Sequence, residues 1–170
     1  QMGRRKIRIG YISPDFTSKH PLAFLMQNVF RHHDKSQFTV NIYSISSSAT
    51  TATNDAIMHE EGPEVQAIHE SSDKFIYLSP QSSPVQMYQR ILDDELDILV
   101  DLCGYAGTSV VSEIMASRCK LRQDQEGNND SDQSTTTTTS RKFPMHVSYM
   151  GFPGSIGSSK VWDYSVFDPI

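Results

Sequence analysis

The chain has 170 residues, which is enough for one domain with a sizeable core, and its formal net charge is −5. An acidic balance disfavours a general nucleic-acid-binding protein, because such proteins are usually basic. No run of residues approaches the roughly 20 apolar positions of a membrane span, and the first residues do not resemble a secretory signal peptide. We therefore expect neither a nucleic-acid partner nor a membrane partner.

The cysteine content points to a reduced intracellular compartment. Cys103 and Cys119 are too few and too far apart for a disulfide framework or a zinc site. Cys103 follows an apolar run, so an inert buried thiol is a better interpretation than a nucleophile.

The first expected elements are a strand over residues 7–12, a loop, and a helix that starts near Pro21. The strand ends near Pro14, which has no N–H to donate. After Pro21, apolar residues recur at helical spacing: Leu22, Leu25, Met26, Val29 and Phe30. Asp15 and His20 therefore lie in a loop at the carboxyl end of a strand, where open α/β sheets bind ligands.

Strands and helices alternate through the rest of the chain. Five further strands are expected at 38–43, 75–78, 97–102, 145–149 and 163–167. Helices are expected over 54–69 (two short helices or one bent helix), after Pro84, and over 110–115. This order predicts an α/β fold, an open and mostly parallel sheet with helices on both faces.

Two polar stretches interrupt this pattern. Residues 120–142 contain one aliphatic residue, Leu121, and no aromatic residue, so we interpret them as a disordered insertion. The acidic run at 93–95 has the composition of a cation site, but an exposed, solvated turn is the better interpretation.

Three loops are expected at the same edge of the sheet, namely 13–21, 103–108 and 150–159, and together they predict a cleft. An imidazole such as that of His20 takes or gives a proton near neutral pH. Asp15 either orients that imidazole or accepts a proton itself. The structural alternative is that Asp15 braces the loop while His20 caps the helix. The sequence has no glycine-rich phosphate motif and no G-x-S-x-G elbow.

Three motifs have a recognisable order and spacing. They are Gly-Tyr-Ile-Ser-Pro-Asp-Phe at 10–16 followed by His20-Pro21, Asp-Ile-Leu-Val-Asp-Leu-Cys-Gly-Tyr at 97–105, and Tyr-Met-Gly-Phe-Pro-Gly-Ser at 149–155. Together they resemble the catalytic region of the protein O-GlcNAc transferases. The Asp15-to-His20 spacing is one residue longer than the usual pattern of that family.

The resemblance implies a fold and an activity. Residues 1–170 would form the first Rossmann-like lobe of a GT-B glycosyltransferase, with the insertion at about 120–142. Such enzymes transfer N-acetylglucosamine from UDP-GlcNAc to Ser or Thr of intracellular proteins, with inversion and without a metal or other cofactor. A second lobe, expected on the C-terminal side, holds most of the nucleotide, so the isolated chain would be inactive. The implied location is cytoplasmic or nucleocytoplasmic.

The resemblance also implies roles for individual residues. His20 and Asp15 match the catalytic positions. The substrate-binding positions match Pro21, Tyr105, Met150, Gly151 and Pro153. Met150 stands where the family usually has Leu, and Leu22 stands where many members have Thr.

Two alternatives to this function remain, one a related enzyme and the other a chain without catalytic activity. A SPINDLY-type protein O-fucosyltransferase lobe would use GDP-fucose, but that branch typically has His-Ser and Gly-His where this chain has His20-Pro21 and Gly104-Tyr105. A non-catalytic Rossmann-like binding module, or a fragment, is the other alternative. Absence of UDP binding by the isolated lobe would favour it.

Overall fold

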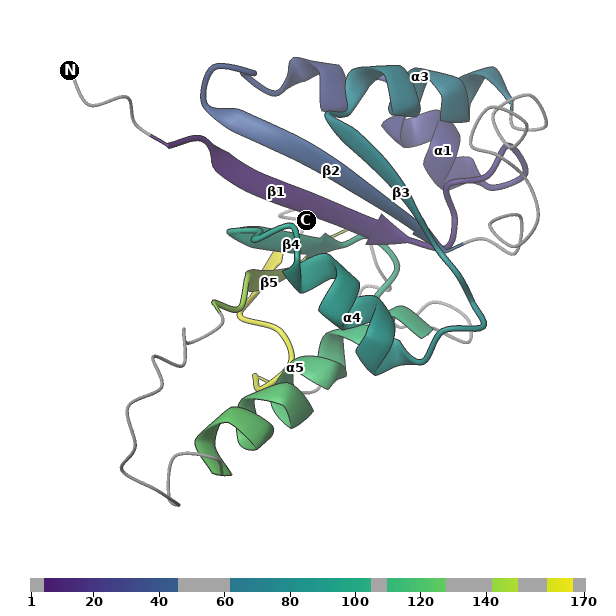
Figure 1. Cartoon of the computed structure of the whole chain (residues 1–170). Helices are drawn as coiled ribbons and strands as arrows, with labels where there is room; N and C mark the ends of the chain where they lie inside the picture. Colours follow the sequence, from purple (N-terminus) through teal and green to yellow (C-terminus); the bar gives the residue numbers. More distant parts are fainter. Residues whose placement is uncertain (1–4, 46–61, 105–109, 128–141, 150–158, 167–170) are drawn as a thin grey trace.

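In the computed structural model of the chain, the described residues form one sheet of six strands (Figure 1). The structure describes residues 5–45, 62–104, 110–127, 142–149 and 159–166. The strands are β1 (Ile7–Ser13), β2 (Phe38–Ile45), β3 (Lys74–Leu78), β4 (Ile98–Asp101), β5 (Met145–Tyr149) and β6 (Tyr164–Val166). Their spatial order is β3-β2-β1-β4-β5-β6, and each neighbouring pair is parallel. The predicted open sheet is therefore confirmed, and it is parallel throughout.

Helices cover both faces of this sheet, as predicted. One face carries α1 (Pro21–Met26), the short 3₁₀ helix η1 (Phe30–His32) and α3 (Pro63–Ser71). The other face carries α4 (Pro84–Leu92) and α5 (Val110–Gly127), as Figure 1 shows. Among the described residues, no helix is both long enough and apolar enough to cross a membrane.

Alternation along the strands sorts the apolar side chains into two layers. On β2, Val40 and Ile42 face the layer beneath α1 and α3, whereas Tyr43 and Ile45 face the layer beneath α4 and α5. Because both faces of the central strands are covered, side chains on both sides of β2 are buried.

The first helix is shorter than its apolar stripe predicts. Leu22 and Met26 are buried, and α1 ends after Met26. Leu25, inside α1, and Val29, in the turn between α1 and η1, are both exposed. The stripe therefore predicts the start of the helix correctly but not its full length.

The predicted start of the disordered insertion, residue 120, is wrong, because α5 continues to Gly127. Residues 120–127 are helical. Leu121 packs against the core beneath α5, and the Arg122 guanidinium lies 5.2 Å from the centre of the Phe143 ring. These two contacts join the last part of α5 to the rest of the fold. The remainder of the insertion, 128–141, lies outside the described residues.

The acidic run at 93–95 is not a fully solvated turn. The Asp94 side chain is only 5% exposed and forms ion pairs with Lys74 and Arg90. It also accepts a hydrogen bond from the Tyr43 hydroxyl at 2.8 Å. Burial alone would raise the pKa of Asp94, but the hydrogen bonds from Lys74 and Tyr43 outweigh it, and the pKa is lowered. Asp94 therefore binds the end of α4 to β2 and β3.

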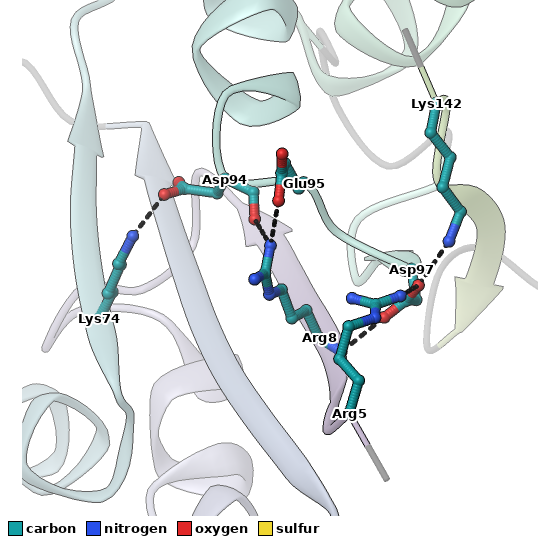
Figure 2. Close-up of polar contacts among 7 residues, drawn as sticks. All are labelled: Arg5, Arg8, Lys74, Asp94, Glu95, Asp97 and Lys142. Carbon is teal, nitrogen blue, oxygen red and sulfur yellow. Dashed lines mark hydrogen bonds and ion pairs between the residues drawn. The ribbon is translucent and has the colours of Figure 1, made fainter. Parts of the chain in front are cut away.

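A second carboxylate, Asp97, joins three segments at the amino end of β4. Figure 2 shows it between Arg5 and Lys142, whose side-chain nitrogens each lie 2.6 Å from Oδ1. Its Oδ2 accepts the backbone N–H of Arg8 at 3.0 Å. Burial opposes ionisation, but these hydrogen bonds lower the pKa of Asp97 to about 2. The carboxylate thus stays charged. It joins the start of β4 to the segments that lead into β1 and β5.

Candidate functional site

The strand order reverses direction between β1 and β4. From β1 the chain proceeds to β2 on one side, and from β4 it proceeds to β5 on the other. In open α/β sheets, the crevice at such a switch point, outside the carboxyl ends of the strands, is where ligands bind. The described parts of two predicted loops lie there, 14–20 after β1 and 103–104 after β4. The Leu102 N–H donates to the Ile12 carbonyl at 3.2 Å, which joins the starts of these two loops.

The loop after β1 is anchored from inside. Ser13 is fully buried, and its hydroxyl accepts the backbone N–H of Asp15 at 3.0 Å. Phe16 is also fully buried, with edge contacts to the rings of Phe30 and Phe75. The residues on either side of this anchor, 14–15 and 17–20, are left closer to the surface. The local sequence thus fixes a loop whose polar side chains remain accessible.

His20 caps helix α1 and faces Asp15. Its Nδ1 accepts the backbone N–H of Leu22 at 3.2 Å, and its backbone is extended, as an N-cap requires. Its Nε2 lies 4.0 Å from Oδ1 of Asp15, and the two side chains are 49% and 28% exposed. The capping interaction predicted as the structural alternative is therefore present, together with an accessible imidazole–carboxylate pair.

The cap determines which nitrogen of His20 carries the proton. A nitrogen that accepts a hydrogen bond has no proton of its own, so neutral His20 carries its proton on Nε2. Nε2 is then a donor that points towards Asp15. To act as a base through Nε2, the imidazole would have to change tautomer and give up the bond to Leu22. The carboxylate of Asp15 is the free acceptor of the pair.

The loop after β4 starts from a buried carboxylate. Asp101 is fully buried, and its Oδ1 accepts the backbone N–H groups of Cys103 and Gly104 at 2.8 and 3.0 Å. Gly104 has a φ of 56°, a conformation that glycine adopts without strain. Burial raises the pKa of Asp101, although the two N–H groups oppose this. Cys103 is buried, in agreement with its interpretation as an inert thiol.

A buried network fixes both ends of the third predicted loop. His146 on β5 is fully buried; its Nε2 accepts the Tyr88 hydroxyl at 2.7 Å, and its Nδ1–H donates to the Val161 carbonyl at 2.7 Å. Arg118 on α5 pairs with Asp163, which also accepts the His146 backbone N–H at 2.8 Å. Sequence reasoning missed this network, because its members come from four separated segments.

Three of the seven predicted site residues come together in the structure. His20, Asp15 and Pro21 lie side by side at the carboxyl edge of β1. The other four lie outside the described residues: Tyr105, Met150, Gly151 and Pro153. Within the described part of the chain, no three His, Cys, Asp or Glu side chains gather as a metal would need.

Comparison with known proteins agrees with the resemblance. Residues 1–123 match the profile of glycosyl transferase family 41. A probable UDP-N-acetylglucosamine–peptide N-acetylglucosaminyltransferase of Arabidopsis thaliana, SEC, is 30% identical over 98% of this chain and 13% of its own length. A relative from the same plant, with the same descriptive name but called SPINDLY, is 25% identical over 98% of this chain and 14% of its own length. The SPINDLY alternative is therefore not the better supported one.

A solved structure shares the fold. An O-GlcNAc transferase mutant of Thermobaculum terrenum superimposes with a TM-score of 0.68 at 21% identity, covering 97% of this chain and 24% of that one. The six-stranded parallel sheet thus corresponds to a Rossmann-like lobe of that enzyme. This chain spans only 13% and 14% of the two plant relatives. Since the family profile matches residues 1–123 of 170, the chain belongs to glycosyl transferase family 41.

Proposed function

We propose that this chain is the first lobe of a longer enzyme that transfers N-acetylglucosamine from UDP-GlcNAc to Ser or Thr hydroxyls of proteins. The family membership and the printed names of the relatives support the donor and the acceptor class. The observation that carries the proposal is the accessible His20–Asp15 pair at the switch point of the sheet. An accessible imidazole and carboxylate at the carboxyl ends of the strands lie where open α/β sheets bind ligands, and both groups can take part in proton transfer.

In this reaction the acceptor oxygen bonds to the anomeric carbon while the bond from that carbon to the diphosphate oxygen breaks. UDP leaves, and the hydroxyl proton must go to a base, because a neutral hydroxyl is a weak nucleophile. The tautomer of His20 makes Nε2–H a hydrogen-bond donor, which would orient a substrate oxygen. The Asp15 carboxylate, 4.0 Å away, would accept the proton.

The remaining parts of the proposal concern partners. Pro21, Tyr105, Met150, Gly151 and Pro153 would line the sugar and acceptor pocket. A second lobe, C-terminal to this chain, would hold most of the nucleotide, and no metal or other cofactor would be needed. The enzyme would act in the cytoplasm or nucleocytoplasm. The support for these points is the resemblance to protein O-GlcNAc transferases.

The first prediction separates capping from catalysis at His20. In the full-length gene product, His20→Ala should lower kcat by about 10²–10³-fold, the usual contribution of one positioned hydrogen-bond donor. His20→Asn should be similarly impaired while remaining as stable as the wild type, because an Asn side chain also caps a helix. Asp15→Asn should lower kcat at least as much as His20→Asn if Asp15 takes the proton. The measurements are kcat, unfolding stability and UDP affinity.

The control is UDP affinity, which should change little because the nucleotide belongs mainly to the second lobe. Near-normal kcat in His20→Asn would reduce His20 to a helix cap, and its catalytic role would be withdrawn.

A further inference from the structure

The amino end of α3 touches the loop that carries His20. Gly62 directly precedes α3, and the space where its side chain would be is already filled. A Cβ at Gly62 would lie 2.7 Å from the Cβ of Ser18 and 2.7 Å from Oε1 of Glu64. Both separations are far shorter than van der Waals contact, which for carbon pairs is about 3.5–4.0 Å. Only glycine allows the two segments to approach this closely.

Position 62 requires glycine because there is no space for a side chain, and not because of the backbone conformation. Gly62 has a φ of −65° and a ψ of 168°, values that any L-residue adopts without strain. Alanine would therefore fit the backbone of Gly62 and would conflict only with its neighbours. The effect of such a change depends on which neighbour yields.

Of the two neighbours, Ser18 is the one that cannot move freely. Glu64 meets the site with the end of a flexible side chain, which can change rotamer although the residue is only 6% exposed. The Cβ of Ser18 is attached to the backbone of a tight turn, closed by the His20 N–H donating to the Thr17 carbonyl at 3.2 Å. Phe16, fully buried, holds the chain immediately before this turn. A push on Ser18 is therefore transmitted along the turn to His20.

We propose that Gly62 is a positioning residue for the His20 loop: its missing side chain seats α3 against Ser18 and so sets the place of the imidazole relative to Asp15. The effect on sugar transfer rests on the function proposed above. Misplacement of a reacting group by about 1 Å can cost on the order of 100-fold in rate. The packing effect itself does not depend on which reaction the enzyme catalyses.

The test is a set of four variants of the full-length gene product: Gly62→Ala, Ser18→Gly, and Gly62→Ala combined with either Ser18→Gly or Glu64→Ala. Gly62→Ala should lower kcat by about 10–100-fold, with a smaller change in the KM for UDP-GlcNAc. Ser18→Gly alone should have little effect, and in the double variant it should restore most of kcat. Glu64→Ala should not rescue, because it leaves the contact with Ser18 in place.

A second readout does not require activity. In the 170-residue chain, the Cε1–Hε1 NMR signal of His20 should shift in Gly62→Ala and return in the Ser18→Gly double variant. If the wild-type enzyme transfers no sugar, the proposed function fails while this NMR comparison still decides the role of Gly62. Three outcomes would overturn the inference. The first is an unshifted His20 signal in Gly62→Ala, and the second is rescue of Gly62→Ala by Glu64→Ala but not by Ser18→Gly. The third is a Gly62→Ala, Ser18→Gly double variant that remains as impaired or as unfolded as Gly62→Ala.

Discussion

At the scale of single residues, His146 connects the fold to pH. Burial, together with the nearby positive charge of Arg118, lowers the pKa of His146 to about 3. In the unfolded chain an imidazole has a pKa of about 6.5. As the pH falls below about 6.5, the His146 imidazole therefore becomes protonated in the unfolded chain but stays neutral in the folded chain. The stability associated with His146 is fully present above that pH and is lost progressively as the pH falls towards 3.

Replacing His146 with Gln, which cannot be protonated, should remove this dependence. Between pH 6 and pH 5 the wild-type chain should lose about 1 kcal/mol more unfolding free energy than the variant, because one proton corresponds to about 1.4 kcal/mol per pH unit. Urea unfolding of both chains at the two pH values measures this difference. Equal losses in the two chains would show that His146 becomes protonated in the folded state as well.

Single residues also show where sequence reasoning reaches its limit. His20 and Asp15 could be predicted because an imidazole and a carboxylate are known proton-transfer groups and because both lie in one short loop. The role of Gly62 was not, because it depends on Ser18, a residue 44 positions earlier that only the fold brings into contact. Asp94 was expected in solvent for a similar reason: two of its three partners, Tyr43 and Lys74, come from strands far away in the sequence.

At the scale of elements, α5 divides the predicted insertion into two parts. Replacing residues 128–141 with a Gly-Ser stretch of equal length should change the unfolding free energy by no more than about 1 kcal/mol, since the composition offers almost nothing to bury. The same replacement extended over 120–142 should cost distinctly more. It removes the contacts of Leu121 and of Arg122, and the ion pair between Lys142 and Asp97.

Chemical denaturation of the two replacement variants distinguishes these outcomes, with Leu121→Ala as the matched single change. A loss of several kcal/mol on replacing 128–141 alone would show that this segment packs against the fold.

The strands were easier to predict than the helix ends. Period-two alternation and short apolar runs are local properties, and they located all six strands to within one or two residues. The end of α1 after Met26 and the end of α5 at Gly127 depend on packing partners elsewhere in the chain. Those partners do not appear in any local window, so the stripe over 22–30 and the polar run from 120 were both misjudged at their ends.

At the scale of the whole molecule, the function proposed above requires a second lobe beside this one. We expect the purified 170-residue chain to transfer no sugar from UDP-GlcNAc above a His20→Ala control, because the second lobe would hold most of the donor. A radiolabelled donor and a protein acceptor provide the measurement, and a longer gene product carrying the second lobe is the positive control. Turnover by the isolated wild-type chain that His20→Ala abolishes would contradict the two-lobe arrangement.

The fold class could be predicted from the regular alternation of strands and helices. The position of β1 in the middle of the sheet has a separate consequence, which concerns folding during synthesis of the chain on the ribosome. β1 is made first, and its second neighbour β4 begins only at Ile98. At a translation rate of about 5–20 residues per second, one edge of β1 stays without its partner for on the order of 5–20 s. During that interval the nascent chain exposes an unpaired strand edge, the kind of surface that chaperones cover and that aggregates form upon.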